Sequence, residues 1–247
     1  VNSFQMLLNV APMEGLMLLV IGPIWDQWVV GKSAYVDYAW TPEAMKAVLG
    51  DEVGLALKES RLKLAYQPIV QARSRQVSHH ECLLRMVKPD GSILTAGHFV
   101  PAAEQMGIVH LVDRFALEAT INKLRAHKKV TLAVNVSGTA ASDPAWLQDF
   151  VEYVRTARDV ADRLIVELTE TAALHHFEEN SRFVSQLREL GVRVAIDDFG
   201  AGYTSFRNLQ MLRVDTVKID KSFLARMATM PDSTEIVRPA APKVLAP

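Results

Sequence analysis

The chain has 247 residues, a formal net charge of −1 and a hydrophobic content of 49%. This composition is typical of a globular protein with room for one large domain, and it excludes a disordered chain. The balanced charge disfavours a dedicated DNA- or RNA-binding protein, which usually carries a basic excess. A single cysteine, Cys82, excludes an internal disulfide framework and a multi-cysteine zinc site, and it fits a reducing, cytoplasmic location.

Residues 1–40 have the least readable pattern, and we interpret them as a segment that packs on the main domain or as a remnant of an upstream domain. Within them, the apolar run Leu16–Ile21 suits a buried strand or a short buried helix. The stretch Leu16–Trp25 is about half of the ~18 apolar residues that a membrane span needs, so we expect no span in this chain. Because the chain begins at Val1, we expect a fragment and leave a membrane anchor upstream of it open.

Strands and helices alternate from Thr41 onward. Thr41-Pro42-Glu43 is a helix start, with an N-cap, a proline at the first helical position and an acid in the first turn. Six strands are predicted, at about Lys63–Val70, Ser78–Met86, Val130–Ser137, Arg163–Thr169, Val192–Phe199 and Asp215–Asp220. Helices are predicted between them, near Ala96–Gly107, Leu111–Ala126, Pro144–Ala157, Phe177–Leu190 and Ser205–Leu212. The pattern predicts an α/β domain with a mostly parallel sheet over residues 41–230, followed by a Pro-rich tail at 231–247.

Polar residues that are costly to bury lie on five of these strands. They are Glu81, Asn135, Glu167, the pair Asp197-Asp198, and Lys218. Each alone has an ordinary explanation, as a surface residue, a turn or half of a structural ion pair. Together they favour a site, because the carboxyl ends of parallel strands meet at one edge of the fold. Oxygen ligands suit Mg²⁺, Mn²⁺ or Ca²⁺ better than Zn²⁺, and the adjacent carboxylates could bridge two ions, an arrangement that suits phosphoester hydrolysis.

Several short motifs occur in a fixed order along the chain. They are Tyr66-Gln67-Pro68-Ile69, Glu81-Cys82-Leu83-Leu84-Arg85, Asn135-Val136-Ser137, Glu167-Leu168-Thr169-Glu170, Asp197-Asp198-Phe199-Gly200-Ala201-Gly202-Tyr203 and Lys218-Ile219-Asp220. This series, from about Glu59 to Leu224, closely resembles the EAL domain family. The resemblance implies a modified (β/α) barrel of the TIM type that hydrolyses cyclic-di-GMP to linear pGpG with Mg²⁺ or Mn²⁺. It also makes a homodimer plausible.

The resemblance implies a role for each motif residue. The metal ligands would be Glu81, Asn135, Glu167, Asp197 and, for a second ion, Asp198. Lys218 would lie near the attacking water, and Glu170 would steady the loop after Asp197-Asp198. Gln67 and Arg85 would contact the dinucleotide. From the residues themselves, Glu81 and Arg85 have the same parity on one strand, so both side chains can face the site.

Two departures from the family pattern affect the prediction. The signature Glu-Ala-Leu reads Glu81-Cys82-Leu83, and Cys82 is expected to point away from Glu81 into a packed space. Beyond Asp220 the family has two further strands, with a glutamate for the second metal and a glutamine near the ligand, and this chain has neither. Six strands of eight predict an incomplete barrel. We expect truncation, with completion by a partner chain or by Leu16–Ile21 as alternatives. A catalytically impaired module that binds cyclic-di-GMP or a protein is therefore the alternative to a phosphodiesterase.

Overall fold

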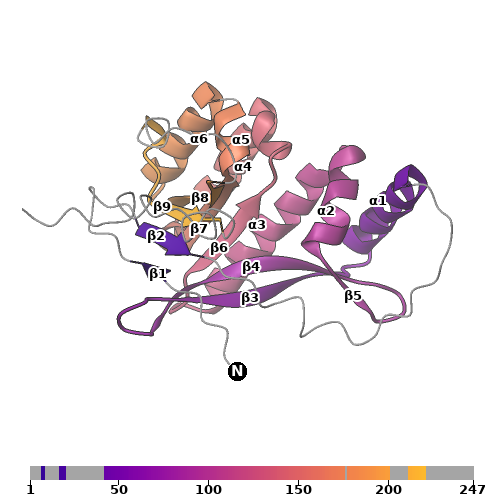
Figure 1. The fold of residues 1–247 in the computed structure, drawn as a ribbon, viewed down its shortest axis with the longest axis horizontal. Coiled ribbons are helices and arrows are strands. Elements are labelled where there is room, and N and C mark those ends of the chain that lie inside the picture. Colours follow the sequence, from indigo (N-terminus) through magenta and orange to yellow (C-terminus); the bar gives the residue numbers. More distant parts are fainter. Residues whose placement is uncertain (1–6, 9–16, 21–41, 176, 201–210, 221–247) are drawn as a thin grey trace, which may run out of the picture.

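The computed structural model describes residues 7–8, 17–20, 42–175, 177–200 and 211–220 (Figure 1). The strands are β1 (Leu7–Leu8), β2 (Met17–Val20), β3 (Leu62–Val70), β4 (Val77–Val87), β5 (Ile93–Thr95), β6 (Leu132–Val136), β7 (Leu164–Thr169), β8 (Arg193–Phe199) and β9 (Thr216–Ile219). The helices are α1 (Pro42–Lys58), α2 (Ala96–Gln105), α3 (Val109–Ala126), α4 (Pro144–Arg155), α5 (Glu170–His175) and α6 (Phe177–Glu189). Within these ranges, none of the helices combines the length and hydropathy that crossing a bilayer requires.

The strands form one curved sheet in the order β1-β2-β9-β8-β7-β6-β4-β3, with β5 paired to β4. Strands β4, β6, β7, β8 and β9 run parallel to one another, and β3 runs antiparallel to β4. Among the described residues, the end strands β1 and β3 do not pair with each other. The predicted fold class, an α/β barrel of the TIM type that is not closed, is confirmed.

Strand residues alternate between two environments. Odd-numbered positions on β6 and β7, such as Asn135 and Glu167, face the concave side, while Val134 and Val166 enter the main hydrophobic core. Figure 1 shows the helices along one side of the sheet, where they cover this core. Cys82 belongs to the core and is buried, as its parity opposite to Glu81 predicted. The concave side is therefore left for polar side chains.

A small apolar layer lies on the concave side beside the polar residues. Ala133, Ile165 and Ala195 form a separate buried cluster. Each lies two residues before a polar residue of the same strand, namely Asn135, Glu167 and Asp197. Alanine leaves room in the narrow interior of a barrel, and isoleucine fills it. This layer closes the floor beneath the polar side chains and keeps water from reaching them from below.

The predictions agree with the structure in number and position of α-helices and strands over residues 42–200, with two additions. Strand β5 has three residues and helix α5 has six, so neither is long enough to show a hydrophobic period. The short 3₁₀ helices Ala140–Ser142 and Ala161–Arg163 were not predicted either. The predicted helix at Ser205–Leu212 and the tail at 231–247 lie mostly or wholly outside the described residues.

The sheet gains two strands from the first forty residues. Met17–Val20 forms β2, which pairs in parallel with β9 so that Leu19 lies opposite Lys218. Leu7–Leu8 forms β1, antiparallel to β2. Part of the apolar run Leu16–Ile21 thus adds a strand to the sheet, as one of the expectations from the sequence allowed. The pairing covers the edge of β9 that would otherwise be open, and β9 is the strand that carries Lys218.

Candidate metal and active site

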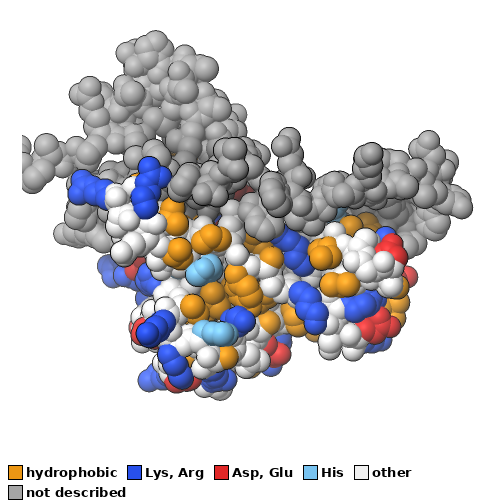
Figure 2. All heavy atoms as spheres, turned by 90° about the horizontal axis from the view of Figure 1, so that it is seen from below, with side chains coloured by type: hydrophobic (Ala, Val, Ile, Leu, Met, Phe, Trp, Pro, Cys, Tyr) orange, Lys and Arg blue, Asp and Glu red, His pale blue; other side chains and the backbone are white. Residues whose placement is uncertain are grey.

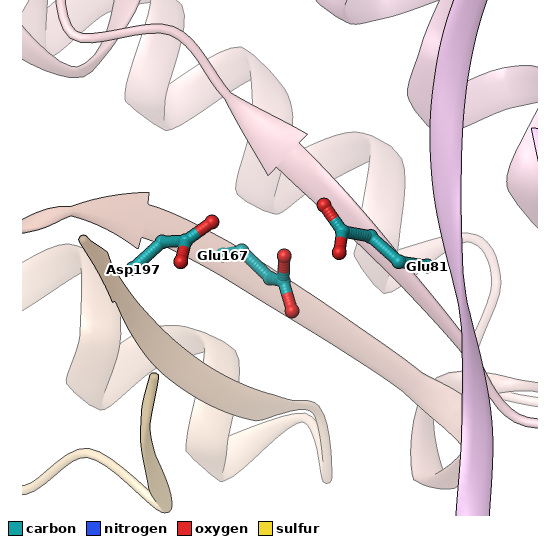
Figure 3. Close-up of side chains that lie close together, drawn as sticks. All are labelled: Glu81, Glu167 and Asp197. Atoms are coloured by element: carbon teal, nitrogen blue, oxygen red, sulfur yellow. The ribbon is translucent and has the colours of Figure 1, made fainter. Parts of the chain in front are cut away.

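Three carboxylates from three parallel strands converge on the concave side of the sheet. Glu81 of β4, Glu167 of β7 and Asp197 of β8 each offer an oxygen, and these oxygens lie within 4.8 Å of one another. Figure 3 shows the three side chains pointing toward a common region between their strands. Glu167 is 1% exposed and Glu81 6% exposed, so the cluster is shielded from water. Buried carboxylates repel one another unless a cation lies between them.

Lys218 of β9 supplies that cation from within the chain. Its Nζ atom lies 2.6 Å from Glu167 Oε2, 2.9 Å from Asp197 Oδ2 and 3.2 Å from Glu81 Oε2. Although burial lowers the pKa of Lys218, the three carboxylates raise it above its ordinary value, so the ammonium stays charged. One ammonium offsets only one of three negative charges. The cluster therefore has charge left to attract a second cation.

The burial of Glu167 has an electrostatic cost that shows in its pKa. Burial and, to a smaller extent, the neighbouring carboxylates of Glu81 and Asp197 raise the pKa of Glu167 to about 8, against the opposing attraction of Lys218. Binding a divalent cation requires the ionised carboxylate. The side chain is thus held in an environment that favours neutralisation by a proton or by a metal ion.

The donor set fits a hard divalent cation. The amide of Asn135 donates from Nδ2 to Glu81 Oε1 over 3.0 Å, which leaves its carbonyl oxygen as the atom free to bind a metal. Ligand oxygens lie about 2.1 Å from Mg²⁺, so they are at most about 4.2 Å apart. A small inward movement of oxygens that already lie within 4.8 Å satisfies this distance. Oxygen donors alone favour Mg²⁺ or Mn²⁺.

Asp198, the predicted ligand of a second ion, is not part of the three-carboxylate cluster. It is exposed and has a positive φ of 56°, and its backbone N–H donates to Asp197 Oδ1 over 2.9 Å. The pairing of β8 with β9 shifts register between Ile196 and Phe199, so the strand bulges at this point. Burial and the nearby carboxylate of Asp197 raise the pKa of Asp198. Both acids lie near the carboxyl end of β8, and only the first of them joins the cluster.

Glu170 connects the end of β7 to the segment that follows β8. It is the first residue of α5, it is buried, and its Oε2 accepts a hydrogen bond from the backbone N–H of Gly200 over 2.7 Å. Gly200 has a φ of 92°, a conformation that favours glycine. The bond fixes the chain directly after Asp197-Asp198. Gly202 and Tyr203 of the same motif lie outside the described residues.

The two residues predicted to contact substrate lie on the β3–β4 hairpin. Gln67 is the direct partner of Glu81 across the two strands, so both side chains are on the same face. Arg85 is four residues further along β4, opposite Lys63 and Thr95, and is half-buried. Its Nη1 donates to the carbonyl of Leu84 over 2.8 Å, and burial lowers its pKa. The hairpin thus forms one wall next to the carboxylate cluster.

One buried acid near the site has no counterpart in the sequence-based prediction. Asp113 of α3 accepts hydrogen bonds from the backbone N–H of Ser137 over 3.1 Å and from its hydroxyl over 2.8 Å. Ser137 Oγ in turn accepts from the N–H of Ala140, so the turn two residues after Asn135 is fixed. Burial raises the pKa of Asp113 to about 7, although both bonds from Ser137 lower it. The signal for Asp113 in the sequence was an acid among apolar residues at helical spacing in Val109–Ala126.

These features define a class of protein: an open α/β barrel with a cluster of carboxylates on the concave side of its parallel strands. The sequence profile of the EAL domain matches residues 51–241. The chain therefore belongs to the EAL domain family, as its motifs indicated.

Known relatives and solved structures agree with this assignment. The chain is 30% identical over 193 residues to the cyclic di-GMP phosphodiesterase NbdA of Pseudomonas aeruginosa, covering 76% of this chain and 25% of NbdA. It is 31% identical over 194 residues to PdeD of Escherichia coli, a probable cyclic di-GMP phosphodiesterase, covering 77% of this chain and 36% of PdeD. The chain thus spans about a quarter to a third of the length of these curated relatives.

The structural likeness covers most of both molecules compared. The phosphodiesterase PaMucR in complex with c-di-GMP superposes with a TM-score of 0.68 at 29% identity, over 76% of this chain and 78% of that one. The FimX EAL domain of Pseudomonas aeruginosa, bound to c-di-GMP, gives a TM-score of 0.67 at 26% identity, over 76% and 77%. Both comparisons place this chain among domains that were solved with the same dinucleotide.

Proposed function

We propose that this chain is a metal-dependent phosphodiesterase that hydrolyses cyclic-di-GMP to linear pGpG. The observation that carries the proposal is the cluster of Glu81, Glu167 and Asp197 around Lys218, with Asn135 beside it. Relatives named cyclic di-GMP phosphodiesterases and a structural neighbour in complex with c-di-GMP support the substrate.

The residues of the site would have different roles. Glu81, Asn135, Glu167 and Asp197 would hold Mg²⁺ or Mn²⁺, and Asp198 would hold a second ion. A bound divalent cation supplies a Lewis acid that lowers the pKa of water and offsets charge on phosphate oxygens. The Lys218 ammonium, fixed by three carboxylates, would orient the attacking water and stabilise the negative charge that develops at phosphorus.

The remaining residues would place the substrate and the ligands. Gln67 and Arg85 line the hairpin wall, where an amide and a guanidinium can bind guanine edges and phosphate oxygens. Glu170 would keep Asp197 and Asp198 in position through its bond to Gly200. In the reaction, water adds to one phosphorus, the bond to one 3′ oxygen breaks, and that oxygen takes a proton. The ring opens to a linear dinucleotide with a 5′ phosphate.

The test is product formation from cyclic-di-GMP in the presence of Mn²⁺, followed by chromatography. We expect linear pGpG from the unaltered chain and at least a ~10²-fold lower rate from Glu81→Gln, because one carboxylate of the site is lost. The matched control is Glu178→Gln, an exposed acid on α6 that should leave the rate unchanged. Equal rates in the unaltered chain and Glu81→Gln would contradict the proposal.

The alternative function is a module that binds cyclic-di-GMP without turnover. The observation that favours it is the occupation of the cluster centre by Lys218, whose three contacts can satisfy the carboxylates without a metal ion. Calorimetry distinguishes the two functions. If the chain binds the dinucleotide but forms no pGpG over hours, it is a binding module and not a phosphodiesterase. If it neither binds the dinucleotide nor forms pGpG, both proposals are overturned.

A further inference from the structure

The two ends of the parallel sheet carry opposite charge, although the whole chain is almost neutral. The segments that precede β4, β6, β7, β8 and β9 are residues 71–76, 123–131, 155–163, 188–193 and 213–215. Together they contain twelve lysines and arginines and four acids. The stretches at the carboxyl ends of β4, β6, β7 and β8, residues 88–95, 137–143, 169–179 and 197–200, contain one lysine and seven acids. The amino-terminal end of the sheet is therefore a basic face.

Four of the five segments of the basic face are in contact in two pairs. Arg125 pairs with Asp159 at 3.3 Å, and Arg163 donates to the carbonyls of Leu124, His127 and Val130, so the segments before β6 and β7 are in contact. Arg188 pairs with Asp215 at 3.3 Å, and this pair connects the segments before β8 and β9.

Figure 2 shows Lys and Arg side chains on the left of the displayed face, the side where the turn between β3 and β4 lies in Figure 1, and others on its right. The ion pairs connect the segments before β6 and β7 and, separately, those before β8 and β9.

Some cations of the basic face are paired or bonded within the protein, and others are not. Arg163 and Arg188 bond to carbonyls and acids, and basic residues in the last turn of a helix stabilise its dipole. Five exposed cations, however, lie in turns and loops at this end and form no ion pair within the ranges that the structure describes: Arg73, Lys128, Lys129, Arg158 and Arg213. Their charge is available to an anionic partner.

The geometry favours a lipid surface over a nucleic acid. The five basic segments contain no Phe, Trp or Tyr, whereas single-stranded nucleic acids are bound by stacking on aromatic side chains. Helices α3, α4 and α6 direct their C-termini to this face, so these three helices offer carbonyl groups there and not the N–H groups that bind individual phosphates. Long, mobile side chains around a rim suit a fluid layer of anionic headgroups, to which clusters of four to eight Lys or Arg bind.

We propose that the basic face binds the surface of a membrane that contains anionic phospholipids. The carboxyl-terminal end of the sheet, with the acidic site, then points away from the lipid into water. A small anionic ligand can reach the site from solution, and the acids at that end are kept away from the negatively charged surface. The proposal goes beyond the proposed function and does not depend on hydrolysis.

The experiment measures partition of the full chain onto vesicles by sedimentation. The vesicles are phosphatidylcholine alone or phosphatidylcholine mixed with phosphatidylglycerol, at low and at high salt. We expect binding to the mixed vesicles only, weakened by salt. Each cation near a lipid surface strengthens binding about fivefold, so Lys128→Gln/Lys129→Gln/Arg158→Gln should weaken it about 100-fold.

A matched variant with the same change of charge supplies the control. Lys58→Gln/Lys88→Gln/Arg182→Gln alters three cations outside the basic face and should bind as the unaltered chain does. Circular dichroism of both triple variants verifies that they fold. Absence of binding to the mixed vesicles, or equal weakening by both triple variants, would overturn the proposal. Tighter binding to an oligonucleotide than to the vesicles, lost in the first variant, would assign the face to nucleic acid instead.

Discussion

The charged residues at the two ends of the sheet differ in burial and in how closely they are paired. On the concave side of the sheet, Lys218 is buried and three carboxylates lie within 3.2 Å of its Nζ atom. At the amino ends, cations such as Lys128 and Arg158 are exposed and separate. A buried charge depends strongly on its partner, because water cannot replace that partner. An exposed charge depends on its partner weakly and acts mainly through the field that it shares with its neighbours.

The largest expected effect is the loss of the buried cation. Lys218→Met leaves Glu81, Glu167 and Asp197 without their ammonium, so we expect the free energy of unfolding to fall by about 3–5 kcal/mol in the absence of metal. Urea denaturation with a chelator present measures this loss. Adding Mn²⁺ should recover part of it, since a ligand of the native state stabilises that state.

The control for this prediction is a lysine from the other end of the sheet. Lys129→Met removes an exposed ammonium and should change the free energy of unfolding by less than about 0.5 kcal/mol. Equal losses in the two variants would contradict the distinction between the two ends.

The next effect is a dependence of stability on pH that comes from Asp113. Its pKa is about 7 in the native state and its ordinary value is 3.8, so the native chain holds a proton that the unfolded chain releases. The resulting stabilisation is present below pH 4 and is lost as the pH rises to 7, by at most about 4 kcal/mol. Asp113→Asn removes this dependence. As the pH rises, the variant should therefore become more stable relative to the unaltered chain.

Thermal unfolding at several pH values measures this difference. The control is Asp149→Asn, an exposed acid on α4 whose replacement should leave the pH profile parallel to that of the unaltered chain. If Asp113→Asn and the unaltered chain gave parallel profiles, Asp113 would not hold its proton as described.

A smaller effect is expected from the connection between β7 and β8. Glu170→Ala removes the acceptor for the Gly200 N–H and leaves that donor unsatisfied, which costs about 1–3 kcal/mol. Glu170→Gln keeps a carbonyl oxygen at the same position and should recover most of the stability. Urea denaturation of the two variants checks the order, and a more stable Glu170→Ala than Glu170→Gln would refute the role of this bond.

The smallest effect belongs to an exposed pair at the amino-terminal end. Arg125 and Asp159 are half exposed and lie 3.3 Å apart. A double-mutant cycle of Arg125→Gln and Asp159→Asn should give a coupling energy below about 1 kcal/mol that decreases at high salt. A coupling energy as large as the loss of unfolding free energy in Lys218→Met would contradict the difference between the two ends.

The strands that hold the site could be predicted from the sequence because each has two independent signals. β6 and β7 alternate between core residues such as Val134 and Val166 and polar residues such as Asn135 and Glu167, so period and polarity agree. Cys82 follows the same rule on β4. The convergence of the polar residues then followed from the parallel arrangement of the strands.

Other features depend on contacts distant in sequence and could not be predicted. Nothing local specifies that Met17–Val20 pairs with β9, about two hundred residues later along the chain. Asp113 has the pattern of a helix residue, and its bonds to Ser137 depend on how α3 packs against β6. The central place of Lys218 among three carboxylates likewise requires the register of four strands. Hydrophobic period identifies elements, but tertiary packing decides which polar groups meet.

The central claim is that the three-carboxylate cluster binds a divalent cation despite its internal ammonium. Calorimetric titration of the unaltered chain and of Glu167→Gln with Mn²⁺ tests it most directly, since the readout does not require substrate or turnover. The account predicts saturable binding to the unaltered chain and an affinity at least about tenfold lower in Glu167→Gln. Absence of Mn²⁺ binding, or equal affinity in both proteins, would contradict it.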